Sequence, residues 1–491
     1  MPELKPLFEP KSIAIIGASS KTGKTGNIIL RGILDHGYRG KVYPINPHED
    51  DIYGLKAYPS IKYVPGTVDL AIIAIPAPVV LGVVEECAEK AVKFGVIISA
   101  GFGEASDRGA ELERQIVEIA KSRGMRLLGP NSIGIVNSSK NLVITIAPFE
   151  TWREGTISII AQTGVFAGAV AHWVMQTQYF GIGKSVSLGN KCDLDEADVL
   201  EHLWRDSNTR VVGVYLEGIR DGRKLMNIAS NATKQKPVIL VKSGRTEAGS
   251  KAAASHTGSM SGNDALSDAA FKQCGIIRVE NFEEFMDLLK AFDYQPLPKG
   301  NRVGILTLSG ASGVLATDIC TKLGLSIPKL SEETKKRIET TIMPSWQPAS
   351  NPVDIWIALG NGAELAHKTA LNALLEDENV DCVLAILLAL SPAAFNIKKV
   401  FQKAHEKHPN KPIVVSIIGG KMARQWFKKL EKIRIPAYLT TASPERAAKV
   451  LHAMYRYKQY LERSERIITK TSLQDHLTNL NHVTCYHSNN E

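Results

Sequence analysis

The sequence lacks several features that would mark a secreted, metal-binding or membrane protein. Its six cysteines are scattered, with no C-x-x-C pair and no spacing typical of a metal site. They indicate free thiols in a reducing compartment. No apolar run reaches the roughly 18 residues that a membrane span requires, and the N-terminus has no apolar signal-peptide core. We therefore expect a soluble, cytoplasmic protein.

The chain also lacks a block of basic residues. A net charge of +9 over 491 residues is modest, which disfavours nucleic-acid binding. The basic excess suits small anionic ligands such as phosphates equally well. With 44% hydrophobic and 22% charged residues, the chain can bury several cores. Its length predicts about two to four domains.

Short apolar runs alternate with longer amphipathic stretches, which is typical of βα units around parallel sheets. The runs show no strict polar alternation, so we expect both faces of each strand to be buried. The predicted strands lie at 12–17, 68–76, 94–101, 156–162, 210–218, 236–244, 301–310, 380–390 and 411–418.

Three of these strands lead into a turn of small residues and then a helical pattern, which suggests three α/β units. Boundaries are expected near 130–155 and 292–301. The predicted domains are 1–130, 150–292 and 300–457, followed by a tail over 458–491. The tail is charged and then polar without a clear period, so we expect it to be poorly ordered.

The first turn, GASSKTGKTG, has the composition of a ligand-binding loop. A dinucleotide fingerprint would need glycine where Ser19 stands, and an acidic residue where KVYPINP ends in Asn46 and Pro47. ASSKTGKT matches a phosphate loop apart from its first alanine, but the strand VDLAIIAIPAP ends without the aspartate that would hold magnesium. Coenzyme A is a third candidate, because turn N–H groups and lysines can meet its phosphates. A tight βα turn with solvated lysines is the simplest alternative.

A second unusual run is AASHTGSMSG, residues 253–262, which places one histidine among small and flexible side chains. Its Ser, Thr and Gly content predicts a mobile loop. An exposed loop histidine with no chemical role is one interpretation of it.

Several segments combine in a characteristic order: SIAIIGASSKTGKTGN, KVYPINP, DLAIIAIPAPVV, ISAGFGE, GPNSIGIVN, SIIAQTG, LEGIRDG and SHTGSMSG. This series resembles the alpha subunit of nucleoside-diphosphate-forming acyl-CoA synthetases over about residues 5–457. The similarity is greatest to the ADP-forming acetate–CoA ligase branch, with succinyl-CoA synthetase a more distant relative. It implies an α/β fold in which a Rossmann-like CoA-binding domain precedes two flavodoxin-like domains.

The resemblance also implies a catalytic pair. His256 would be the phosphorylated histidine, since an imidazole nitrogen can accept and release a phosphoryl group when a carboxylate holds its other nitrogen. Gly258 and Gly262 would act as hinges for a swinging loop. Glu217 matches the orienting carboxylate, although it could equally be a strand-end residue that pairs with Arg220.

The remaining site residues implied by the resemblance fall into two groups, with no metal ligand among them. The CoA-binding group is Gly17, Ser19, Ser20, Lys21, Gly23, Lys24, Asn46, Pro47, Ile75, Pro76 and Asn131. The phosphate-binding group lies at two strand-to-helix turns and is Gln162, Thr163, Gly164, Ser309, Gly310, Ala311, Ser312 and Gly313.

The implied reaction interconverts acyl-CoA, ADP and phosphate with acid, CoA and ATP through an acyl phosphate and a phosphohistidine. Nothing in the three α/β units resembles an ATP-grasp domain, so we expect ADP and Mg²⁺ to bind a separate beta subunit, in an α2β2 assembly. Two alternatives stay open on the residues alone: a non-catalytic acyl-CoA-binding regulatory protein, and a P-loop NTPase.

Overall fold

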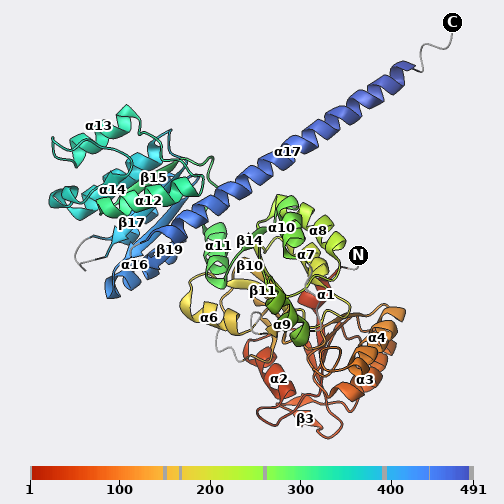
Figure 1. Ribbon diagram of the computed structural model, residues 1–491. Coiled ribbons are helices and arrows are strands. Elements are labelled where there is room, and N and C mark those ends of the chain that lie inside the picture. Colours follow the sequence, from red (N-terminus) through yellow and green to blue (C-terminus); the bar gives the residue numbers. More distant parts are fainter. Residues whose placement is uncertain are drawn as a thin grey trace. The chain divides into compact units, whose positions relative to one another are not determined.

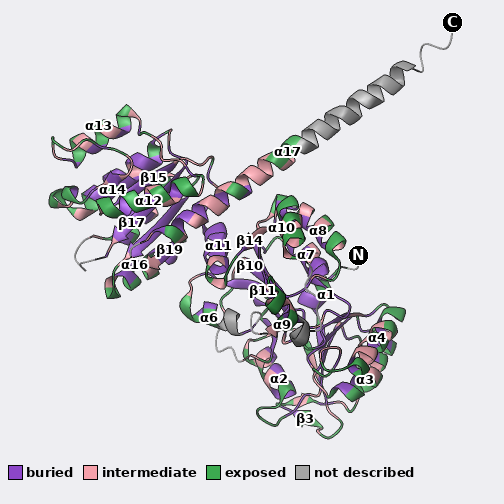
Figure 2. Cartoon of the chain, in the orientation of Figure 1, coloured by how far each residue is buried: buried purple, intermediate pink, exposed green. Residues whose placement is uncertain are grey.

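The computed structural model describes residues 3–147, 152–164, 168–257, 263–389, 395–441 and 443–485, though not the side chains of 169–172, 254–257 and 467–485. The chain forms two compact units, Met1–Asp293 and Tyr294–Glu491. In both, buried strands are flanked by helices (Figure 1 and Figure 2). No helix in the described part of the chain has both the length and the apolar character needed to cross a bilayer.

The first unit begins with a parallel five-stranded sheet of order β2-β1-β5-β6-β7. Its strands are short and apolar; all five residues of β1 are buried. The chain runs from β1 to β2 on one side and continues at β5 on the other, so β1 and β5 flank a switch point, where open α/β sheets bind ligands. The elements are α1 (Lys5–Phe8), β1 (Ser12–Ile16), α2 (Thr25–Asp35), β2 (Lys41–Ile45), β3 (Asp51–Ile52), β4 (Leu55–Lys56), η1 (Ile61–Tyr63), β5 (Leu70–Ile73), α3 (Ala77–Glu89), β6 (Phe94–Ile97), α4 (Asp107–Ser122) and β7 (Arg126–Leu128).

A seven-stranded sheet of order β14-β13-β12-β10-β11-β8-β9 completes this unit. The strands from β14 to β11 are parallel, whereas β8 and β9 form an antiparallel hairpin at one edge. The elements are β8 (Gly134–Asn137), η2 (Ser138–Lys140), β9 (Leu142–Thr145), β10 (Ile157–Ala161), α6 (Ala169–Thr177), β11 (Ile182–Ser187), α7 (Glu196–Arg205), β12 (Val211–Leu216), α8 (Gly222–Gln235), β13 (Val238–Lys242), α9 (Glu247–Thr257), α10 (Asp264–Gln273), β14 (Ile277–Val279) and α11 (Phe282–Tyr294).

The β8–β9 hairpin joins the two sheets of this unit. Helix α2 packs against β9, and a Cβ on Gly32 would lie 3.2 Å from the carbonyl oxygen of Val143. One hydrophobic core runs from the first sheet through Ile135 and Ile144 of the hairpin into the second sheet. Residues of β8 and β9, which lie between the first two predicted domains, are therefore part of a shared core.

Unit Tyr294–Glu491 contains a parallel five-stranded sheet of order β16-β15-β17-β18-β19. Helices α12 and α17 pack against it (Figure 1). The elements are β15 (Val303–Thr307), α12 (Gly310–Lys322), α13 (Glu332–Thr341), β16 (Val353–Asp354), η3 (Ile357–Asn361), α14 (Ala363–Glu376), β17 (Cys382–Leu388), α15 (Ile397–Lys407), β18 (Ile413–Ile418), α16 (Lys421–Glu431), β19 (Ala437–Thr440) and α17 (Glu445–Cys485).

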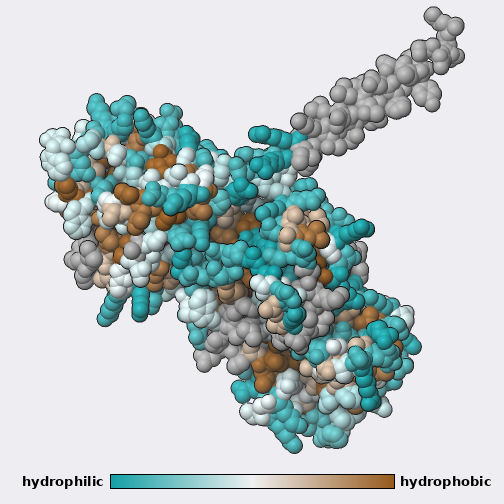
Figure 3. Space-filling model, in the orientation of Figure 1, coloured by the Kyte–Doolittle hydropathy of each residue, from teal (hydrophilic) through white to brown (hydrophobic). Residues whose placement is uncertain are grey.

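Large apolar side chains are exposed on this second unit. Trp346 is 68% and Trp356 54% exposed, and Val314 of α12 is 64% exposed. Figure 3 shows hydrophobic atoms over the region of α12 and α14. Since Val314 directly follows the predicted phosphate-binding residues 309–313, apolar surface begins at the N-terminal end of α12.

All the predicted strands are confirmed, as β1, β5, β6, β10, β12, β13, β15, β17 and β18. The loop predicted for 253–262 is wrong for 253–257, which form the end of α9; the alanines that precede His256 favour helix. Residues 258–262, with the proposed hinges Gly258 and Gly262, lie outside the described residues. In the predicted tail, α17 extends to Cys485, and from residue 458 to that point the sequence has no proline or glycine to end it.

Candidate active site

The predicted CoA-binding turn follows β1 at the switch point of the first sheet. Gly17 has φ +88°, and a Cβ there would lie 2.5 Å from the carbonyl oxygen of Ala74. A Cβ on Gly26, in the first turn of α2, would lie 1.9 Å from the carbonyl oxygen of Gly17. These close approaches hold the N-terminus of α2 against the turn. The predicted residues of the turn, and Ile75 and Pro76 after β5, therefore lie at one edge of the sheet.

An acidic residue that sequence analysis passed over closes this turn. The Ser19 hydroxyl donates to Glu49 Oε1 at 3.1 Å, and the Ser20 N–H donates to Oε2 at 3.1 Å. Asn46 Nδ2 also donates to Oε1, at 3.0 Å. Hydrogen bonds from Ser20 lower the pKa of Glu49 below its usual value. The groups expected to bind an anionic ligand thus already hold a carboxylate of the chain itself.

The carboxyl edges of the two sheets in this unit meet at the segment Gly129-Pro130-Asn131. The N–H of Asn131 donates to the carbonyl oxygen of Ser99 at 2.9 Å, which fixes the segment to the first sheet. The N–H of Asn190, after β11 of the second sheet, donates to the carbonyl oxygen of Pro130 at 2.9 Å. A Cβ on Gly189 would lie 2.0 Å from the same oxygen. Asn131, one of the predicted CoA-binding residues, therefore lies where the two sheets meet.

Asn190 also joins two carboxylates of the first sheet's domain. Its Nδ2 donates to Glu104 Oε2 at 2.5 Å and to Glu113 Oε2 at 3.0 Å. Burial raises the pKa of Glu113. Burial acts to raise that of Glu104 as well, but hydrogen bonds from Asn190 and from backbone N–H groups bring the pKa of Glu104 below its usual value. The two neighbouring carboxyl groups thus differ in their affinity for a proton.

Gln162 and Glu217 lie side by side at the carboxyl edge of the second sheet. They follow the neighbouring strands β10 and β12, and are 2% and 6% exposed. Gln162 Oε1 accepts hydrogen bonds from the N–H groups of Glu217, at 2.9 Å, and Gly218, at 3.1 Å. Burial raises the pKa of Tyr215, and the neighbouring Glu217 acts in the same direction. The side-chain oxygen of Gln162, predicted to bind phosphate, is therefore bonded to the backbone of the predicted catalytic carboxylate.

The other phosphate-binding candidates lie at two helix starts. A Cβ on Gly164 would lie 2.5 Å from Ile133 Cγ2, so the turn 162–164 contacts the segment that follows Asn131. In the second unit, α12 begins at Gly310, and the Ser309 hydroxyl caps it by accepting from the Ser312 N–H at 3.4 Å. First-turn N–H groups of a helix lack carbonyl partners within it and suit an anion. The role of both turns in phosphate binding stays a prediction.

His256 is the penultimate residue of α9, and its side chain lies outside the described residues. Thr246 precedes this helix, and its hydroxyl accepts from the Gly249 N–H at 3.0 Å. Arg220, the alternative partner considered for Glu217, donates to the carbonyl oxygens of Lys191 and Cys192. The catalytic role of the two predicted residues stays a prediction.

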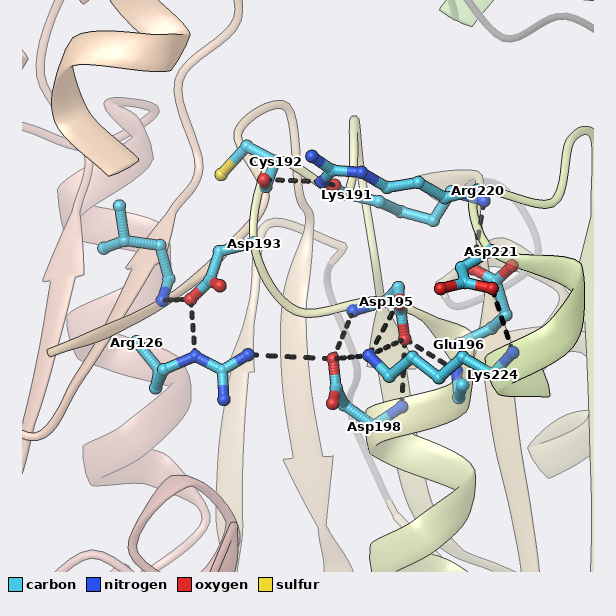
Figure 4. Close-up of polar contacts among 12 residues, drawn as sticks. Arg126, Lys191, Cys192, Asp193, Asp195, Glu196, Asp198, Arg220, Asp221 and Lys224 are labelled. Atoms are coloured by element: carbon cyan, nitrogen blue, oxygen red, sulfur yellow. Dashed lines mark hydrogen bonds and ion pairs between the residues drawn. The ribbon is translucent and has the colours of Figure 1, made fainter. Parts of the chain in front are cut away.

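A charged cluster binds the first domain to the second (Figure 4). Arg126, at the start of β7, pairs with Asp193 at 2.7 Å and with Asp198 at 3.7 Å. Lys224 of α8 pairs with Asp198 at 2.8 Å and Asp195 at 2.9 Å. Sequence analysis missed this cluster, because only the fold brings β7, α7 and α8 together.

Three family profiles match this chain. They are a CoA binding domain over residues 11–138, a succinyl-CoA ligase like flavodoxin domain over 154–292 and a Ligase-CoA domain over 303–464. Together with the parallel sheets, these matches confirm the predicted fold class.

Individual relatives point the same way. The chain is 40% identical over 462 residues to the alpha subunit of ADP-forming acetate–CoA ligase I of Pyrococcus furiosus. This match covers 93% of the chain and 98% of that subunit. It is 44% identical over 391 residues to ADP-forming acetate–CoA ligase II of Archaeoglobus fulgidus, covering 79% of this chain but only 58% of that protein. A solved structure of dinucleotide forming acetyl-coenzyme A synthetase 1 of Ca. Korarchaeum cryptofilum, in complex with phosphate and ADP, matches 94% of this chain and 99% of its own with a TM-score of 0.87 and 37% identity.

Proposed function

Because this chain belongs to the family of ADP-forming acetate–CoA ligases, as a chain of the alpha-subunit type, we propose that it interconverts acyl-CoA, ADP and phosphate with acid, CoA and ATP. One observation carries the proposal beyond the family. The turn expected to bind CoA and the pair Gln162 and Glu217 lie at carboxyl edges of two sheets that meet within one unit. A thioester bound at the first edge would thus be delivered toward the second.

The proposed reaction has three steps. An oxygen of phosphate attacks the thioester carbonyl carbon, the C–S bond breaks, and the CoA thiolate leaves and takes up a proton. A ring nitrogen of His256 then attacks phosphorus, and the carboxylate of the acid leaves. Finally an oxygen of the ADP β-phosphate attacks the phosphohistidine, which forms ATP and frees the imidazole. Glu217 would hold the second ring N–H, and helix N-termini would stabilise charge on the phosphoryl oxygens.

We assign the nucleotide step to a second polypeptide. The relative that this chain spans to 98% is named an alpha subunit, which implies a partner subunit, whereas the chain spans 58% of the longer Archaeoglobus protein. We assign ADP and Mg²⁺ binding to a separate ATP-grasp beta subunit, in an α2β2 assembly in the cytoplasm. CoA and phosphate would bind this chain.

The division of labour predicts that the purified chain alone takes up phosphate but does not make ATP. With acetyl-CoA, ADP and phosphate, ATP measured by luciferase should stay at background, and adding the co-purified beta subunit should restore turnover. Full turnover by the single chain would contradict the proposed need for a partner.

Replacing Glu49 by glutamine should tighten CoA binding. Glu49→Gln removes a negative charge that competes with the CoA phosphates for Ser19 and Ser20, and we expect the Kd for CoA to fall about two- to five-fold, the size of an exposed charge interaction. Titration calorimetry would measure it. Glu85→Gln, the same change at an exposed position of α3 in this domain, is the matched control. An unchanged Kd for Glu49→Gln would show that CoA does not compete for these groups.

A further inference from the structure

The segment Glu217-Gly218 is held by buried side chains rather than by a neighbouring strand. We propose that Gln162, Lys191 and Lys242 are positioning residues, which fix the backbone of Glu217 and Gly218 and so set the direction of the Glu217 carboxylate. This inference rests on the proposed function, in which that carboxylate orients His256. It assigns a role in catalysis to residues that need not touch any substrate.

The N–H groups of the segment are both bound by Gln162. Strand pairing with β13 ends where the Ser243 N–H donates to the carbonyl oxygen of Leu216 at 2.9 Å. Immediately beyond, Gln162 Oε1 accepts from Glu217 N and Gly218 N at 2.9 and 3.1 Å. Buried backbone groups must find partners, and here one amide oxygen serves two of them.

The carbonyl oxygens of the segment are bound by two lysines. Lys242 Nζ donates to the carbonyl oxygen of Glu217 at 2.9 Å, and Lys191 Nζ donates to that of Gly218 at 2.7 Å. Both lysines are 4% exposed, and burial lowers the pKa of Lys242. The two N–H and two C=O groups of the segment are therefore fixed by three side chains, which come from the residue after β10, from β13 and from the loop after β11.

Lys191 is itself anchored. Its Nζ lies 3.0 Å from Glu196 Oε2, and the two side chains are 4% and 2% exposed. Its backbone has φ +60°, and Arg220 donates to its carbonyl oxygen and, at 2.6 Å, to that of Cys192 (Figure 4). The same loop carries Asn190, which bonds to Pro130. The ammonium that holds Gly218 thus belongs to the loop that joins the two sheets.

Fixation of this kind suits a group that must orient another. A catalytic side chain held loosely loses rate even when it is present, because misplacement by about 1 Å can cost about 100-fold. The alternative is that the three side chains only satisfy buried backbone groups and contribute to stability alone. The positioning role and the purely structural role predict different effects of these substitutions once the Glu217 carboxylate has been removed.

The test compares variants of the full-length chain by the initial rate at which His256 is labelled from acetyl-CoA and radiolabelled phosphate. Gln162→Met removes the shared acceptor, and Lys191→Met with Glu196→Gln removes the anchored ammonium and its counterion together. We expect each to lower the rate at saturating phosphate at least about 10-fold, with the KM for phosphate unchanged. In a Glu217→Gln background neither should lower it further.

A matched control removes another buried ion pair of the same sheet. Lys184 Nζ lies 2.6 Å from Asp206 Oδ2, with side chains 3% and 12% exposed. Lys184→Met with Asp206→Asn should lower the melting temperature but leave the labelling rate within about two-fold. If Gln162→Met does not fold, the double variant Lys191→Met with Glu196→Gln decides the question.

The outcomes separate the two proposals. If Glu217→Gln retains the full labelling rate, the proposed role of Glu217 is wrong. If Glu217→Gln loses the rate while the folded positioning variants keep it, or if their losses multiply with that of Glu217→Gln, the positioning role is overturned and the proposed function stands. A raised KM for phosphate in Gln162→Met alone would make Gln162 a phosphate ligand instead.

Discussion

His256→Ala should reduce labelling of the chain by acetyl-CoA and radiolabelled phosphate to background, at least about 1000-fold below the unsubstituted protein. The reason is chemical, since alanine has no nitrogen that can accept the phosphoryl group in the proposed second step. Acid treatment should release the label from the unsubstituted chain and alkali should not, as expected of a phosphorus–nitrogen bond.

His405→Asn is the matched control for this experiment. His405 is a half-buried histidine of α15 in the other unit, so its loss tests whether any histidine substitution impairs the protein. Labelling should continue at the normal rate. Persistent label in His256→Ala, or label mapped to another peptide by mass spectrometry, would rule out the proposed phosphoryl carrier.

Gly26→Ala should both destabilise the first unit and abolish measurable CoA binding. The new Cβ would lie 1.9 Å from the carbonyl oxygen of Gly17 and 3.0 Å from Ala18 Cα, so α2 must move away from the turn. Overpacking of this kind costs about 1–3 kcal/mol of unfolding free energy, measurable by urea denaturation. CoA titration would show the loss of binding, because the turn and the N-terminus of α2 shift together.

Gly82→Ala controls for the substitution itself. Gly82 lies in α3 of the same domain, and a Cβ there meets nothing within 4 Å. Alanine should be neutral or stabilise the helix by up to about 1 kcal/mol, with CoA binding intact. If Gly26→Ala bound CoA as Gly82→Ala does, the turn after β1 would not be the CoA site.

Most of the fold could be predicted from the sequence because apolar strands buried on both faces stand out as continuous runs. The hairpin of β8 and β9 was missed because its strands do not stand out as long apolar runs. Its strands, Gly134–Asn137 and Leu142–Thr145, are four residues each and lie where a domain boundary was expected. Their assignment to the second sheet depends on pairing with β11, which no local pattern indicates.

The site divides in the same way. Gln162, Glu217 and the turn after Gly17 follow recognisable strands, and the structure places them at carboxyl edges as expected. Glu49 and Lys191 could not be found, because their importance comes from contacts with residues far away along the chain. Ser20 lies 29 positions from Glu49, and Gly218 lies 27 positions from Lys191. Gln162 shows that a correct position does not fix a role: its oxygen faces the backbone of Glu217 and Gly218.

The hairpin has a practical bearing on how this protein can be dissected. The matched CoA-binding region stops at residue 138, between β8 and β9, yet Leu142 and Ile144 of β9 belong to the same apolar cluster as Ile29 and Ile33 of α2. A fragment that ends there lacks β9, so Ile29 and Ile33 of α2 would be exposed to water and would favour self-association. Cleavage after Asp293 falls at the boundary between the two compact units. The shortest N-terminal fragment expected to remain monodisperse therefore carries both the five-stranded and the seven-stranded sheet.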